Sequence, residues 1–158
     1  MLIQVEVASF AVDPGRNSPL IILKEISGSR TLPVPIGPLE ASAIAIESLK
    51  VVPEKPLTID LARIILEQLG GVLSRVVIYD MIEQSLQARL QIAHENSMIF
   101  IDCRPSDAIA LAMRCSTPIF VSDSVLEKNI PGKASEQEKL RRNISSLDTT
   151  EFGRYFLE

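Results

Sequence analysis

The sequence is poor in the residues that build metal cages and in long apolar runs. It has two cysteines, Cys103 and Cys115, and one histidine. Two thiols are too few to hold a metal ion unaided, so we expect both to be reduced, buried and hydrophobic in character. No apolar stretch reaches the roughly 18 residues that span a bilayer, and the start, MLIQVEVASF, lacks the basic flank and the cleavage site of a signal peptide. We therefore expect a soluble, cytoplasmic protein with no membrane partner.

The sequence also lacks a surplus of basic residues. It has 16 lysines and arginines and 20 aspartates and glutamates, which give a formal net charge of −4. A protein that holds nucleic acid on a broad basic surface needs many cations to displace the counterions of the phosphates. The composition excludes that mode of binding, so any contact with nucleic acid has to be local.

The common catalytic signatures are missing as well. There is no glycine-rich phosphate loop, no nucleophile elbow and no cysteine–histidine spacing for a metal. His94 lies in the polar stretch HENS, and no residue that would position its ring is visible. Because a general base needs such a partner, we expect His94 to lie in a surface loop.

Three strands followed by a helix are predicted twice along the chain. A shift of 67 residues aligns 37–46 with 104–113, and a proline, an acid and alternate alanines coincide. We infer an α+β fold with a duplicated strand-strand-strand-helix unit and mixed sheets over residues 1–127. Hydrophobic periodicity places the strands at 3–7, 20–26, 31–37, 72–80, 86–92, 98–102 and 118–121, and the helices at 38–49, 58–69 and 105–115.

Two segments carry finer expectations about packing. Pro33 and Pro35 remove two amide donors from one strand, so that strand belongs at a sheet edge. Thr58 is expected to cap the helix over 58–69, whose apolar side chains form one stripe: Leu61, Ile64, Ile65 and Leu69.

The stretch IDCRPSDAIALAMR, residues 101–114, combines a buried helix with a polar opening. Pro105 suits the first helical position, and Asp107 falls in the first turn. In a functional interpretation, Arg104 and the helix terminus hold a phosphate, while carboxylates hold Mg²⁺ or orient a water molecule. In a structural interpretation, Asp107 caps its helix and pairs with Arg104, and Ser106 supports the turn. The residues alone favour the structural interpretation.

Acidic residues lie at the starts of the predicted helices, and the question is whether the fold brings them together. The internal repeat makes Glu40 and Asp107 equivalent, so a pseudo-twofold arrangement would bring them together as a carboxylate pair. Asp60 also lies in a first helical turn, where compensation of the helix dipole explains it.

The tail, residues 128–158, is expected to be helical. It has a capping box in Ser135 and Glu138, and an apolar seam of Leu140, Ile144 and Leu147. Acids lie among its bases, so packing on the body or on a partner is favoured over a nucleic-acid arm. The aromatic residues near the end indicate docking: Phe152, Tyr155 and Phe156.

The run from Asp102 to Leu111 resembles the hallmark of the bifunctional nuclease domain family. LPVPIGPLEASAIA, and PLTIDL followed by ILEQLGG, are similar to further segments of that family, and the resemblance covers about residues 2–127. It implies a compact α+β fold, self-association and, for some members, degradation of RNA and DNA. The recurrent polar residues of the family fall on Glu40, Thr58, Asp60, Asp102, Arg104, Ser106 and Asp107. Ile59 stands where the family often has a histidine, so any role of that histidine is lost here.

These observations lead to one functional hypothesis and one alternative. The hypothesis is a nuclease that hydrolyses RNA or DNA phosphodiester bonds, with Mg²⁺ or Mn²⁺ as the candidate metal. Asp107 and Glu40 would be catalytic with Asp60 in support, and Arg104 and Ser106 would bind substrate. The alternative is a non-catalytic, oligomeric interaction or regulatory module. In both cases we expect a homo-oligomer.

Overall fold

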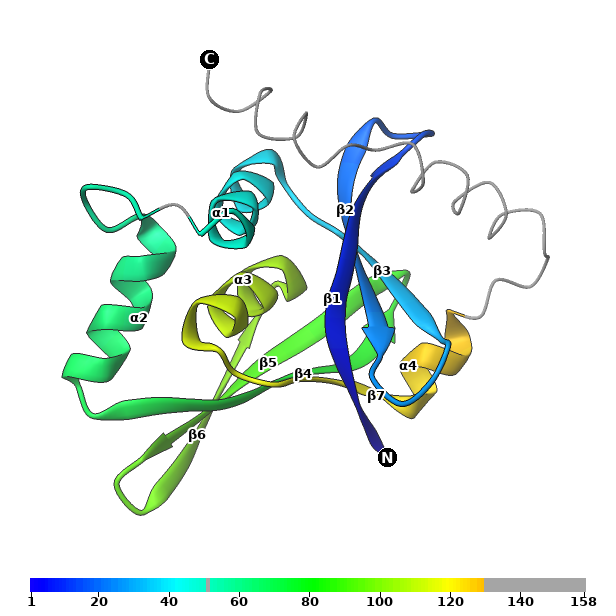
Figure 1. Cartoon of the computed structure of the whole chain (residues 1–158). Coiled ribbons are helices and arrows are strands. Elements are labelled where there is room, and N and C mark those ends of the chain that lie inside the picture. Colours follow the sequence, from blue (N-terminus) through cyan, green and yellow to red (C-terminus); the bar gives the residue numbers. More distant parts are fainter. Residues whose placement is uncertain (51, 130–158) are drawn as a thin grey trace.

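The computed structural model describes residues 1–50 and 52–129 (Figure 1), which form an α+β fold, as predicted. The helix and the apolar seam predicted for the tail lie outside the described residues. Among the described residues, no helix is both long and apolar enough to cross a membrane. The described elements are β1 (Leu2–Asp13), β2 (Ser18–Glu25), β3 (Thr31–Pro35), α1 (Pro38–Ser48), α2 (Thr58–Gln68), β4 (Gly71–Ile82), β5 (Ser85–His94), β6 (Ser97–Cys103), α3 (Pro105–Cys115), β7 (Ile119–Ser122) and α4 (Asp123–Lys128).

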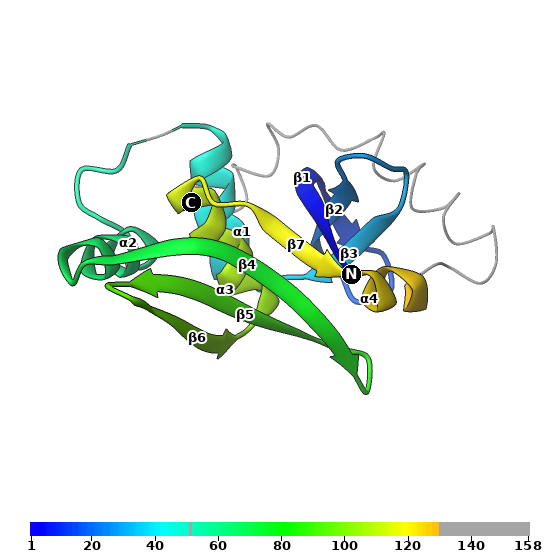
Figure 2. The ribbon, with the colours of Figure 1, turned by 90° about the horizontal axis from the view of Figure 1, so that it is seen from below.

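The strands form one mixed sheet in the order β3-β2-β1-β7-β4-β5-β6. β1, β2 and β3 are one antiparallel meander, and β4, β5 and β6 are a second one. β7 joins them, antiparallel to β1 and parallel to β4. Each meander precedes a helix, α1 or α3, but the duplication itself stays a prediction. Figure 2 shows α1, α2 and α3 on the same side of the second meander.

The two prolines of β3 lie where the sequence places them. β3 pairs only with β2 and forms one edge of the sheet, which confirms that prediction. Because Pro33 and Pro35 cannot donate an amide hydrogen bond, their strand cannot be paired fully on both sides.

The core lies between the sheet and α3. The side chains of Ile21, Leu23, Ile78 and Ile109 are fully buried, and each contributes about 1.5–3 kcal/mol on burial. The central residues of α3, Ala108–Ala112, are all buried, so the burial predicted for this helix is confirmed; residues 108, 110 and 112 are alanine. Alanine at these positions lets α3 approach the strands and its neighbouring helices closely.

Three local expectations need correction. Thr58 does not cap α2, because it is the first residue of the helix and Leu57 occupies the N-cap position. Asp60 Oδ2 accepts a hydrogen bond from the backbone N–H of Leu57 at 3.0 Å. Most of the predicted apolar stripe of α2 is exposed, including Leu61, Ile65 and Leu69, whereas Ile59 and Leu66 pack on the core. The cysteines are free but only half-buried, since both lie at the ends of elements.

Candidate functional site

Arg104 brings the two acid-led helices together. Its Nη2 atom lies 2.7 Å from Glu40 Oε1, and its Nε atom donates to Asp107 Oδ2 at 2.7 Å. Nη2 also donates to Asp107 Oδ1 at 3.1 Å, so the arginine grips that carboxylate with two nitrogens. The carboxylates of Glu40 and Asp107 therefore flank one guanidinium.

The local sequence explains why these side chains converge. Pro38 and Pro105 each lie in the first turn of a helix, and the acid follows two residues later. Arg104 is the extended residue before α3, so its side chain leaves the helix at the amino end, where carboxylates are electrostatically favoured. The contact between α1 and α3 then brings Glu40 to the same arginine.

Gly37 makes room for Glu40. A Cβ atom added at Gly37 would overlap with Glu40 Oε2. The Glu40 side chain is only 15% exposed, so its carboxylate has little free space to retreat into. Gly37 was absent from the sequence-based candidates, although its place directly before Pro38 marks the start of the helix.

The electrostatics keep Arg104 charged. The pKa of Arg104 is raised above its ordinary value, mainly by the hydrogen bond with Asp107. The negative charges of Asp107 and Glu40 raise it further. The arginine side chain is 69% exposed, so water screens these ion pairs and they add little to the stability of the fold. An incoming anion can therefore compete for this guanidinium at little expense to the fold.

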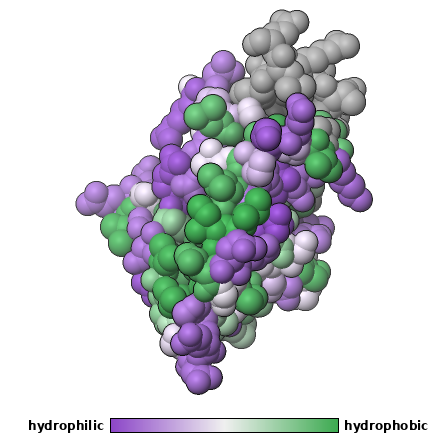
Figure 3. Space-filling view, turned by 90° about the vertical axis from the view of Figure 1, so that its left-hand side faces the viewer, coloured by the Kyte–Doolittle hydropathy of each residue, from purple (hydrophilic) through white to green (hydrophobic). Residues whose placement is uncertain are grey.

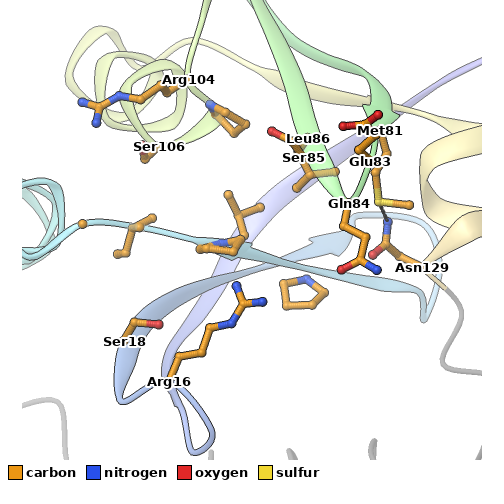
Figure 4. A pocket seen from close by; sticks show the side chains of 16 residues that line it. Arg16, Ser18, Met81, Glu83, Gln84, Ser85, Leu86, Arg104, Ser106 and Asn129 are labelled. Carbon is orange, nitrogen blue, oxygen red and sulfur yellow. Dashed lines mark hydrogen bonds between the residues drawn. The ribbon is translucent and has the colours of Figure 1, made fainter.

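A cleft of about 860 Å³ opens beside this cluster. Arg104 and the buried Ser106 line it from α3, and β3, the β1–β2 turn and the β4–β5 turn form the other walls. Figure 4 shows the side chains of Arg16 and Gln84 reaching toward the cavity, while Arg104 is directed away from its middle. Two arginines and one acid, Glu83, are the charged groups of the lining. Arg104 is paired with the carboxylates of Glu40 and Asp107, which leaves Arg16 as the second cation of this lining, and sequence reasoning missed Arg16.

Cys103 lies directly before Arg104 but is not an activated nucleophile. Burial, followed by the charges of Asp107 and Asp102, raises the pKa of its thiol to about 11. A thiol with this pKa is protonated near neutral pH, and the thiolate is the reactive form.

Asp60 is not part of the Arg104 cluster. Its Oδ1 atom lies 3.2 Å from Nε of Arg114, which is ten residues further along α3, or about 15 Å along the helix axis. Glu47 also forms an ion pair with Arg114, whose side chain is only 10% exposed. Asp60 thus belongs to a second, buried cluster at the opposite end of α3. Sequence analysis did not single out Arg114.

The other polar candidates also have partners elsewhere. Asp102 accepts a hydrogen bond from Arg89 Nε at 2.7 Å, and this bond is the main reason that the pKa of Asp102 is lowered. His94 ends β5, and its Nε2 atom lies 3.1 Å from the carbonyl oxygen of Leu69. Ile59, at the position of the missing family histidine, packs on the core.

The residues in this arrangement do not fit Mg²⁺ or Mn²⁺. Among residues 1–50 and 52–129, no group of three or more histidine, cysteine, aspartate or glutamate side chains is placed to hold a metal ion. Glu40 and Asp107 face a guanidinium, and its positive charge opposes a divalent cation between them.

Comparison with known proteins adds a family to this geometry. The profile of a family described as the bifunctional nuclease domain matches residues 21–131. The chain is 36% identical over 162 residues to an uncharacterized protein of Mycobacterium tuberculosis H37Rv, with 94% of this chain and 97% of that protein covered. It is 30% identical over 116 residues to Bifunctional nuclease 1 of Oryza sativa subsp. japonica and to the bifunctional nuclease of Oryza minuta. That similarity covers 69% of this chain and 34% of each rice protein.

Proposed function

The chain belongs to the bifunctional nuclease domain family, and from this membership we propose that it is a nuclease that hydrolyses phosphodiester bonds of RNA or DNA. One observation carries the proposal: Arg104 lies between two carboxylates at the rim of a cleft that Arg16 also lines. A guanidinium is suited to bind a phosphate, and a carboxylate beside it is suited to accept a proton from water.

Each side chain of the cluster has a role in this proposal. Arg104 turns from Asp107 to the phosphate oxygens while it keeps its ion pair with Glu40, and its charge stabilises the charge that builds up on them. Asp107, released from the arginine, accepts a proton from the attacking water molecule. The oxygen of that water bonds to phosphorus while the bond to the leaving oxygen breaks. A solvent water molecule gives a proton to the leaving oxygen, and Asp107 then gives its own proton to solvent. Glu40 keeps Arg104 oriented, as its low exposure allows little movement.

The remaining candidates act around this centre. Ser106 lines the cleft at the first turn of α3, where free backbone amides also favour an anion. Asp60 supports the site at a distance, by fixing the start of α2 and by pairing with Arg114 in α3. No chemical step is assigned to a metal, because the carboxylates already face Arg104.

The test is cleavage of labelled single-stranded RNA and DNA by purified protein with Mg²⁺, with Mn²⁺ and with chelator. We expect Arg104→Ala and Asp107→Asn to lower the rate at least a hundredfold. Gly37→Ala should also lower it, because the added Cβ displaces the Glu40 carboxylate. Arg63→Ala is the matched control, since Arg63 forms an exposed ion pair with Glu67 on a different helix. Cleavage that survives both Arg104→Ala and Asp107→Asn would come from a contaminant and refute the proposal.

The second candidate is a non-catalytic interaction or regulatory module. The observation in its favour is that the ion pairs of Arg104 with Glu40 and Asp107 join the starts of α1 and α3, as a purely structural link would. In that case Asp107→Asn would lower the free energy of unfolding, and the unmodified protein would cleave neither nucleic acid. Thermal unfolding of each variant beside its cleavage rate separates the two functions.

A further inference from the structure

The two edges of the sheet are protected to very different degrees. At one edge, Pro33 and Pro35 limit the pairing of β3. At the other edge, β6 has no proline and no lysine, and its residues 97–102 are all exposed. Its centre consists of four successive large apolar residues that are 42–55% exposed: Met98, Ile99, Phe100 and Ile101. Such an edge readily pairs with another strand unless it is blocked.

The apolar surface continues from β6 onto its neighbours. Leu61, Ile65 and Leu69 of α2 are at least half exposed, and so is Val72 of β4. The register places Val72, Ala93 and Met98 in one row across three strands, and the contact of His94 with the Leu69 carbonyl joins the end of α2 to that region. Figure 3 shows apolar side chains gathered on the side of the molecule where α2 lies. We call these eight residues the β6 patch: Leu61, Ile65, Leu69, Val72, Met98, Ile99, Phe100 and Ile101.

We propose that the β6 patch is the interface with a second copy of this chain, and that β6 pairs antiparallel with β6 of that copy across a twofold axis. Antiparallel pairing keeps each side chain on its own face of the joined sheet. Ile99 and Ile101 therefore meet the same residues of the partner on the helix side, and Met98 and Phe100 do so on the other side. A twofold interface must be self-complementary, and an uncharged apolar strand centre fulfils this condition.

Charge and area both suit a second copy. A twofold axis brings like charges together wherever they lie close to it, but no charged residue lies between Met98 and Ile101. Asp102, the nearest charge along β6, is already neutralised by Arg89. The four large side chains of β6 each present on the order of 100 Å², so the strand alone contributes roughly 400 Å² per copy, about half of a standard specific interface. The α2 residues extend this surface on the helix side of the sheet, and Val72 extends it on the opposite side.

The test is the mass of the full chain in solution, by light scattering and by sedimentation over a wide concentration range. We expect about twice the chain mass of 17.4 kDa for the unmodified protein. Ile99→Glu and Phe100→Glu place like charges near the axis, and each should raise the dissociation constant of the dimer at least a hundredfold. Ile26→Glu is the matched control, because Ile26 is equally exposed but lies at the far end of β2.

Hydrogen exchange of the segment 97–103 locates the contact independently. In the dimer both edges of β6 are hydrogen-bonded, so its amides should exchange more slowly than in the monomeric Phe100→Glu protein. A full chain that is monomeric at every concentration would refute the proposal. Residues 130–158 or a different protein would then be the alternative occupants of the β6 patch. A dimer that both glutamate variants leave intact, with unchanged exchange in β6, would refute it too.

Discussion

Arg114 shows how one buried cation can hold two helices. Its side chain lies between Glu47 of α1 and Asp60 of α2, and its Nε and Nη2 atoms are buried without a hydrogen-bond partner among the described residues. Removal of the cation leaves two carboxylates uncompensated, of which Asp60 is only 13% exposed. We expect Arg114→Met to lower the free energy of unfolding by about 3 kcal/mol, as measured by urea denaturation.

A second substitution checks the cause of that loss. Asp60→Asn removes one of the uncompensated charges but keeps an oxygen for the amide of Leu57. The double variant Arg114→Met with Asp60→Asn should therefore recover more than 1 kcal/mol relative to Arg114→Met alone. A loss below about 1 kcal/mol in Arg114→Met would show that the ion pairs contribute little.

Cys103 provides a pH-dependent prediction. Its pKa of about 11 means that at pH 8 it reacts with iodoacetamide on the order of a hundred times more slowly than an ordinary thiol of pKa near 8.5. Because the folded pKa is raised, the stability that Cys103 contributes is fully present below about pH 8.5 and is lost as the pH rises toward 11. Peptide mass spectrometry of the alkylated protein measures the rate, and Cys103→Ala should remove this part of the alkaline loss of stability. Rapid labelling of Cys103 at pH 8 in the folded protein would contradict the prediction.

For single residues, the sequence predicts contacts between repeated motifs better than contacts with loop residues. The repeated proline and acid pointed to Glu40 and Asp107, and the structure brings both to Arg104. Arg16 lies in a turn with no repeat and no periodicity, so nothing in its surroundings marked it as a neighbour of α3. The pairing of Glu47 with Arg114 depends on how α1 and α3 cross, and spacing within either helix does not encode that.

The end of α3 carries the prediction at the scale of an element. Ser116 is the C-cap residue of α3 and adopts a left-handed conformation with φ of 52°. A residue with a Cβ atom is strained there, whereas glycine is not. Since Ser116 is exposed, Ser116→Gly should raise the free energy of unfolding by about 1 kcal/mol. Chemical denaturation measures it, and Ala62→Gly in the exposed face of α2 should lower stability by about the same amount.

The sequence predicts the positions of the helices and strands closely, but it predicts less well which face of each element is buried. Alternating residues predicted the strands, and prolines at their first turns predicted α1 and α3. The apolar stripe of α2 is real, yet a helix with two apolar sides leaves open which one meets the core. The structure turns Ile59 and Leu66 inward and leaves Leu61, Ile65 and Leu69 exposed. Periodicity shows that one face of a helix is apolar, but not what packs against it. That face can pack on the core of its own chain or on a second copy of the chain.

The charge of the whole molecule limits how it holds nucleic acid. The protein has a net charge of −4, and the proposed site offers two cations, Arg16 and Arg104. Two phosphate contacts to a single strand give a slope of about −1.4 in the logarithm of the binding constant against the logarithm of the salt concentration. Binding should thus weaken only about sevenfold between 50 and 200 mM salt.

This salt dependence can be measured by fluorescence anisotropy with a labelled single strand and the Asp107→Asn protein, which binds without cleavage under the proposed mechanism. Arg16→Ala should reduce the slope by about 0.7, because it removes one phosphate contact from the cleft. Lys55→Ala is the control, since Lys55 is exposed and does not line this cleft. A slope steeper than about −4 would mean that many more cations contact the strand than this cleft provides. Nucleic acid would then lie on another surface of the molecule, and the local site around Arg104 would not be where it binds.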